Sequence, residues 1–273
     1  QVRTAGQTVT LGDAGTGVTL QGALSIIDTT NAGVTAAGGA INLGGSVQGT
    51  LANTQSLTLN AGTGGAIAAS LAIGGTTDLA TLTVTDSNGA VFTGLVQTDT
   101  SVVLTDTTDD ADIIFNGALT TATLTTAAEQ YDVAINGGAT ITNAVTFTNT
   151  GTLELGNAAA DVMLFTGGVV ATAPSTVFLD GQVRTAGQTV TLGDAGTGVT
   201  LQGGLSIIDT TNAGGTAAGG AINLNGDVQG TLANTQSLTL NAGTGGAIAG
   251  ARTIGGTTDL ATLTVTDSNG AVF

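Results

Sequence analysis

The sequence predicts an all-β fold, a β-solenoid (β-helix) whose turns, or rungs, are roughly 20–25 residues long. Three observations predict this fold. Short strands alternate apolar residues with threonine, turn residues separate these strands, and a long segment of the chain is repeated almost unchanged. Each of these features is expected when strands stack around a narrow interior.

The strands are recognised by their period of two. Leu, Val or Phe falls on one side and Thr on the other in a series of segments at 57–60, 82–85, 102–105, 123–125, 145–148 and 190–192. Alternation of this kind is typical of a half-buried β-strand, and β-branched residues favour it. Several successive segments follow one another at the spacing expected of a rung.

Turn signals lie between the strands. Asn-Gly occurs at 88–89, 116–117 and 136–137, and Gly-Gly occurs at 64–65 and 167–168. Such pairs favour tight turns. Thr, Gly, Asn and Val all disfavour helices, so almost no helix is expected.

The internal repeat is the strongest feature of the sequence. Residues 1–92 recur as residues 182–273, with 84 of 92 positions identical. We therefore expect 1–181 to be one full solenoid repeat unit and 182–273 to be the first half of the next, in one continuous solenoid. Neither end resembles a cap, so we expect the chain to be a segment of a longer array.

The repeat also predicts which residues face inward. The expected interior set comprises Leu57, Leu59, Leu82 and Val84, with their counterparts Leu238, Leu240, Leu263 and Val265. Thr264 and Thr266 are expected to face outward.

Eight positions differ between the copies. The pairs are Ala23/Gly204, Val34/Gly215, Gly44/Asn225, Ser46/Asp227, Ala69/Gly250, Ser70/Ala251, Leu71/Arg252 and Ala72/Thr253. Because a buried, unpaired arginine would be costly, the exchange of Leu71 for Arg252 indicates an outward-facing loop.

The composition limits the partners. Three arginines stand against 17 aspartates and two glutamates, which gives a formal net charge of -16. Nucleic acids and anionic membranes are bound through clustered Lys and Arg, so neither is an expected partner. No apolar run approaches the length that a membrane-spanning helix requires, and therefore no transmembrane segment is expected.

The pattern of residues in this sequence resembles that of a known group of proteins. Residues 139–156, which read ATITNAVTFTNTGTLELG, resemble the repeat regions of giant bacterial surface proteins, in particular filamentous-haemagglutinin-like and autotransporter-like adhesins. The resemblance implies export by a Gram-negative bacterium and an extracellular place, on the cell surface or secreted. It brings no functional residue with it.

The densest acidic segment supplies the metal-site candidates. Asp106, Asp109, Asp110 and Asp112 offer the hard oxygen ligands that Ca²⁺ prefers, and Asp99 lies nearby. The glycine-aspartate nonapeptide of calcium-binding β-rolls and the EF-hand spacing are both absent, so a solvated acidic corner is the alternative. No other cofactor is expected.

No enzyme is expected either. Paired carboxylates could serve glycoside hydrolysis, but the chain has no His or Lys to assist them, and an active site normally interrupts a repeat locally. The expected function is structural. The chain would be a stiff rod in a surface fibre or adhesin stalk that associates with neighbouring repeats or with other solenoids.

The alternative is an adhesive module that binds calcium or carbohydrate. Near-identical repeats favour the structural function, because repetition supplies length and stiffness whereas one specific site needs only one copy.

Overall fold

Every regular element in the described part of the chain is a β-strand. The computed structural model describes residues 1–108 and 110–273, and these contain 29 strands and no helix. Parallel strands stack as a β-solenoid of about 11 turns, which confirms the predicted fold class. The chain divides into two compact units, Gln1–Ala134 and Ile135–Phe273.

The strands of the first unit are short. They are β1 (Val2–Arg3), β2 (Val9–Leu11), β3 (Val18–Leu20), β4 (Leu24–Asp28), β5 (Ile41–Leu43), β6 (Val47–Gly49), β7 (Ser56–Asn60), β8 (Ile67–Ala69), β9 (Leu79–Asp86), β10 (Ala90–Phe92), β11 (Val96–Leu104), β12 (Asp112–Phe115), β13 (Leu119–Thr121) and β14 (Thr123–Thr126). β15 (Asp132–Ile135) lies at the division between the units.

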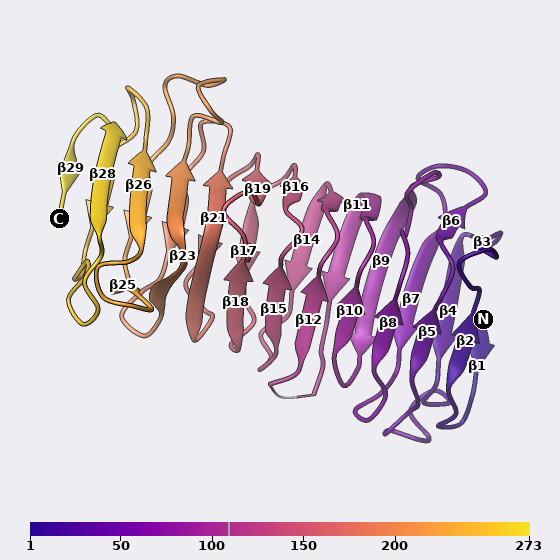
Figure 1. The fold of residues 1–273 in the computed structure, drawn as a ribbon. Helices are drawn as coiled ribbons and strands as arrows, with labels where there is room; N and C mark the ends of the chain where they lie inside the picture. The colour runs from indigo at the N-terminus through magenta and orange to yellow at the C-terminus, as the bar shows by residue number, and fades with distance from the viewer. Residues whose placement is uncertain (109) are drawn as a thin grey trace. The chain divides into compact units, whose positions relative to one another are not determined.

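Three parallel ladders run through the first unit. One joins Ile27, Leu59, Val84 and Leu104. The second joins Val9, Ile41, Ile67, Ala90 and Ile113. The third joins Val18, Val47, Ile73, Val96 and Leu119. Each rung thus contributes to three faces, and strands of successive rungs lie side by side, as β7, β9 and β11 do in Figure 1.

The second unit is built in the same way. Its strands are β16 (Ala139–Ile141), β17 (Val145–Phe147), β18 (Thr152–Leu155), β19 (Val162–Phe165), β20 (Val169–Ala171), β21 (Thr176–Arg184), β22 (Val190–Leu192), β23 (Gly198–Asp209), β24 (Ile222–Leu224), β25 (Val228–Gly230), β26 (Ser237–Asn241), β27 (Ile248–Gly250), β28 (Thr262–Asp267) and β29 (Ala271–Val272). Its ladders include Val145–Val169–Val190–Ile222–Ile248–Ala271 and Ile208–Leu240–Val265.

The core is a column of aliphatic side chains inside each unit. Strands alternate buried and partly exposed residues, most regularly in β21, because successive side chains point to opposite sides of a strand. Aromatic rings stack between rungs. Phe92 and Phe115 lie parallel with ring centroids 5.0 Å apart, and Phe147 meets Phe165 edge to face at 6.1 Å. Such pairs add to the stability that burial provides.

Most rungs have the predicted length, but one rung in each copy is longer. The ladder Leu57–Leu82–Val102–Leu124 advances at the spacing that the sequence predicts. In contrast, Ile27 pairs with Leu59 and Ile208 pairs with Leu240, so each of these two steps spans a longer stretch of chain. The added residues form a loop that leaves the rung after Asp28 and, in the second copy, after Asp209.

Hydrogen bonds fix this long loop at its base. Asp28 accepts bonds from the Thr30 amide at 2.8 Å, the Thr30 hydroxyl at 2.7 Å and the Ala32 amide at 2.8 Å. Gly38 has a positive φ of 57°, and a Cβ there would collide with the Ala61 carbonyl group. Only glycine fits this position, and Gly219 repeats the arrangement in the second copy.

The expected inward set has the predicted register in both copies. Leu57, Leu59, Leu82 and Val84 are buried, as are Leu238 and Leu240. Leu263 and Val265 pair in register with Leu238 and Leu240, yet they are 39% and 38% exposed. Their exposure follows from the place of β28, which among the described residues pairs with β26 alone. Thr264 and Thr266 are exposed, as expected.

Candidate functional site

Of the predicted calcium ligands, Asp106 and Asp110 lie between β11 and β12, and Asp112 is the first residue of β12. Asp106 follows β11, and its carboxylate accepts a bond from the Thr107 amide at 2.8 Å. Asp110 has a positive φ of 61° and accepts a bond from the Gln130 amide group at 2.8 Å. Asp112 begins β12. Asp109 lies outside the described residues.

Two of these carboxylates, Asp106 and Asp112, have a carboxylate neighbour one rung away. Burial, and then the charge of Asp132, raise the pKa of Asp112. Burial and the charge of Asp106 raise the pKa of Asp86 in the same way. In both pairs the two partners are separated by one rung of chain. These partners were not predicted from the sequence, although the rung length is the signal that indicates them.

A third carboxylate pair lies in the second unit. Burial and the charge of Asp161 raise the pKa of Asp180, and its Oδ1 is buried without a hydrogen-bond partner. In each pair, burial and the like charge on the neighbouring rung disfavour ionisation of the more buried carboxyl group. Asp86, Asp112 and Asp180 therefore hold their protons more tightly than free aspartate does.

The described residues contain no group of three or more His, Cys, Asp or Glu side chains that could hold a metal ion. Asp110 and Asp112 do line a shallow groove of about 290 Å³ beside Ile67, Val91 and Ile114. Because Asp109 is not described, the calcium site stays a prediction.

The eight differences between the copies fall mainly on the surface. Leu71 and Arg252 are both exposed, in agreement with an outward loop. Ala69, which corresponds to Gly250 in the second copy, is buried. The other seven pairs lie at exposed or partly exposed positions. Apart from Ala69 and Gly250, the two copies thus share their interior and differ at their surface.

Two of the differences belong together. Asp227 accepts hydrogen bonds from both the amide and the hydroxyl of Thr253, at 3.1 and 2.7 Å. The Thr253 bonds, together with the nearby charge of Arg252, hold the pKa of Asp227 below its usual value. The first copy has Ser46, Leu71 and Ala72 at these places. This polar cluster on the outer surface belongs to the second copy.

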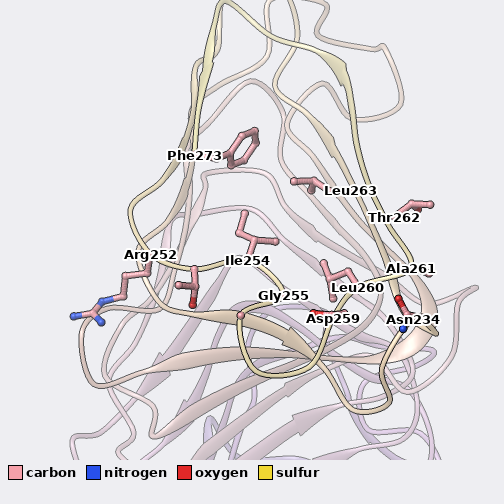
Figure 2. Close-up of a pocket in the computed structure, with 12 residues that line it drawn as sticks. Asn234, Arg252, Ile254, Gly255, Asp259, Leu260, Ala261, Thr262, Leu263 and Phe273 are labelled. Atoms are coloured by element: carbon pink, nitrogen blue, oxygen red, sulfur yellow. The ribbon is translucent and has the colours of Figure 1, made fainter.

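A cavity lies in the interior at the last rung of the chain. It measures about 710 Å³, and Ile254, Leu260, Leu263 and Phe273 form its apolar wall. Figure 2 shows these side chains directed into the space that the rung encloses. Their counterparts in the first copy, Ile73, Leu79, Leu82 and Phe92, are fully buried beneath the following rung.

The comparisons with known proteins give no assignment. The chain matches no family model, no curated protein and no solved structure. In the part of the chain that is described, no helix is long and apolar enough to cross a membrane. The fold defines the class of protein: it is a repeat protein of the β-solenoid type.

Proposed function

We propose that this chain is a structural segment of a repetitive extracellular surface fibre or adhesin stalk, and that it acts as a stiff rod rather than as an enzyme. One observation carries the proposal. The two near-identical copies have the same internal register, since Leu57 pairs with Leu82 as Leu238 pairs with Leu263. A sequence that repeats its packing in this way is suited to adding length.

Packing between rungs supports the proposal. Leu82 is fully buried between the rungs of β7 and β11, whereas Leu263, with a neighbour on one side only, is 39% exposed. A rung therefore depends on both of its neighbours for burial, and its stability comes from stacking. Each added rung extends such a stack by about 4.7–4.9 Å.

The surface charge supports an exposed, hydrated setting. A net charge of -16 makes copies of the chain repel each other at low ionic strength. At physiological ionic strength, screening limits this repulsion to about 8 Å, so lateral association of solenoids becomes accessible. Bacterial origin and cell-surface location rest on the resemblance of residues 139–156 to adhesin repeats.

Location is tested on cells that carry the gene. Antibodies raised against the chain should label fibres on the outside of intact cells in immunogold electron microscopy. Label that appears only after the cells are permeabilised would contradict the proposal.

A second candidate function is supported by the groove beside Asp110 and Asp112. The groove has two carboxylates, whose oxygens are the kind of ligand that Ca²⁺ prefers, beside apolar side chains. Titration calorimetry with CaCl₂ distinguishes the two functions. Saturable binding that Asp112→Asn abolishes and the exposed control Asp194→Asn leaves intact would favour the adhesive module. The structural function predicts no saturable binding.

A further inference from the structure

The number of strand positions in one repeat unit is not a multiple of the number of faces. In the first unit, the chain passes along three faces in a fixed order, which we name A, B and C after the ladders that contain Leu59, Ile41 and Val47. Each passage along a face is one strand position, so β11 fills two positions and Ile73 fills one. From β1 to β15, the described residues fill six positions on face A, six on face B and five on face C, and β15 lies on face B.

The second unit completes the count. β16 pairs with β19, β17 pairs with β20, and β18 pairs with the first part of β21, at 176–179. These six positions make two full turns. The second part of β21 then begins the second copy of the sequence, because residues 183–184 are the counterpart of β1. With the 17 positions of the first unit, one repeat unit has 23 strand positions, or seven full turns and two further faces.

The strand β15 contributes residues to both units and identifies one face in each of them. The amide of its first residue, Asp132, donates to the Ala111 carbonyl at 3.1 Å on face B of the first unit. The carbonyl of its last residue, Ile135, accepts a bond from the Gly156 amide at 2.9 Å, beside β18 in the second unit. The ladder of β18 continues to residues 198–201, which contain the counterpart of β3. In the first copy, however, β3 lies on face C.

The turns agree with this count. In the first unit, a turn of three residues leads from face B to face C, as at 44–46 and 116–118. Three residues, 136–138, also separate β15 from β16, and the turns at 116 and at 136 both begin with Asn-Gly. β16 therefore takes the place of a face C strand. Residues 183–184 belong to the ladder of β16 and β19, whereas β1, their counterpart, lies on face A.

We propose that each repeat unit starts one face away from the unit before it, so that a feature repeated once per unit reaches all three sides of the rod within three units. The inference deepens the structural function and rests on it only for the existence of an array. The rotation itself follows from the 23 strand positions, because 24 positions would bring every unit back to the same face.

The long loop is the surface feature that this rotation distributes. In the first copy it joins face A to face B, between β4 and β5, and its Val34 is 80% exposed. In the second copy it leads from the ladder of β16 to the ladder of β17, between β23 and β24. Neighbouring solenoids can thus meet the loop from three directions. Three units make 23 full turns, so the loop returns to one corner of the rod about every 110 Å.

The experiment measures distances between spin labels on the full chain, which contains no cysteine. Gly215→Cys labels the long loop of the second copy, and Val34→Cys labels the equivalent position in the first. Leu51→Cys labels the turn from face C to face A in the first unit. All three positions are exposed, so the labels do not disturb the core.

The proposal predicts the order of two distances. Leu51→Cys and Gly215→Cys lie at one corner, seven turns or about 34 Å apart along the axis. Val34→Cys and Gly215→Cys lie at different corners, so their separation across the rod adds to an axial rise of about 37 Å. The pair Val34→Cys and Leu51→Cys, which lies within the first unit, is the control for the distance between two corners. Pulsed electron paramagnetic resonance should therefore give the shorter distance for the Leu51→Cys and Gly215→Cys pair.

An equal or reversed order would overturn the inference, because units in phase place both long loops at one corner and make the Val34→Cys and Gly215→Cys pair the shorter. This test is separate from the test of cellular location. A reversed order leaves a surface fibre intact, and a protein that stays inside the cell leaves the order of the two distances unchanged.

Discussion

Thr253 donates two hydrogen bonds to Asp227 of the preceding rung, at 3.1 and 2.7 Å, and both residues are absent from the first copy, which has Ser46 and Ala72 instead. The two positions are neighbours because Val228 pairs with Ile254. Two of the eight differences between the copies therefore form a single interacting pair, with one residue on each of two adjacent rungs.

This coupling is measurable by a double-mutant cycle. Asp227→Ser and Thr253→Ala should each lower the unfolding midpoint of the chain, because Asp227→Ser removes the acceptor of both hydrogen bonds and Thr253→Ala removes the hydroxyl donor of one of them. The double variant, which restores the residues of the first copy, should lose less than the sum of the two single losses. Additive effects in denaturant titrations would show that the two positions are independent.

The equivalent leucines of the two copies, Leu82 and Leu263, should contribute differently to the stability of the chain. Leu82→Ala removes a fully buried side chain and should cost about 2–5 kcal/mol of unfolding free energy. Leu263→Ala, at the counterpart position, should cost much less, because its side chain is 39% exposed. Equilibrium denaturation of both variants makes the comparison. Equal losses would contradict the argument that burial comes from the neighbouring rung.

Asp86 should make stability fall as the pH rises. Burial and the charge of Asp106 raise its pKa above 3.8, so the folded state binds the proton more tightly than the unfolded state does. The resulting stabilisation is present below pH 3.8 and is lost as the pH rises through the folded pKa.

Asp86→Asn tests this sign. Asn60 already occupies the paired position on the preceding rung, so an asparagine side chain suits this ladder. The variant should be more stable than the parent chain at neutral pH, and the gain should shrink toward pH 3.8. Asp99→Asn, at an exposed position, is the control. A variant that is less stable at neutral pH would contradict the assignment.

Asp28 should hold the long loop in place. Burial alone would raise its pKa, but bonds from Thr30 and Ala32 and the charge of Arg3 outweigh that effect and lower it. Asp28→Ala leaves these amides without their acceptor and should cost about 1–3 kcal/mol. Amide hydrogen exchange at Thr30 and Ala32 should accelerate. Asp209→Ala should do the same at Thr211 and Ala213, and unchanged exchange in both copies would refute the role.

The stacked strands could be predicted from the sequence because a strand with one buried side alternates apolar and polar residues with a period of two. Leu57 and Leu59 could be placed inside from their alternation with threonine alone. The two longer rungs were missed because their added loop depends on left-handed residues such as Asn31 and on the bonds to Asp28, which no periodic pattern reveals.

The acidic cluster was harder to predict for a different reason. Asp106 and Asp112 are close in sequence, yet the turn directs them toward different rungs, where they meet Asp86 and Asp132. In a solenoid, the neighbours that matter are one rung away in sequence.

The length of concatenated units tests the central proposal most directly. About 11 turns in 273 residues correspond to about seven turns per repeat unit (residues 1–181), or roughly 35 Å. Electron microscopy of chains with one, two and four units should show particles of constant width whose length grows by about 35 Å per unit. Particles that thicken in all directions as units are added would contradict a structural rod.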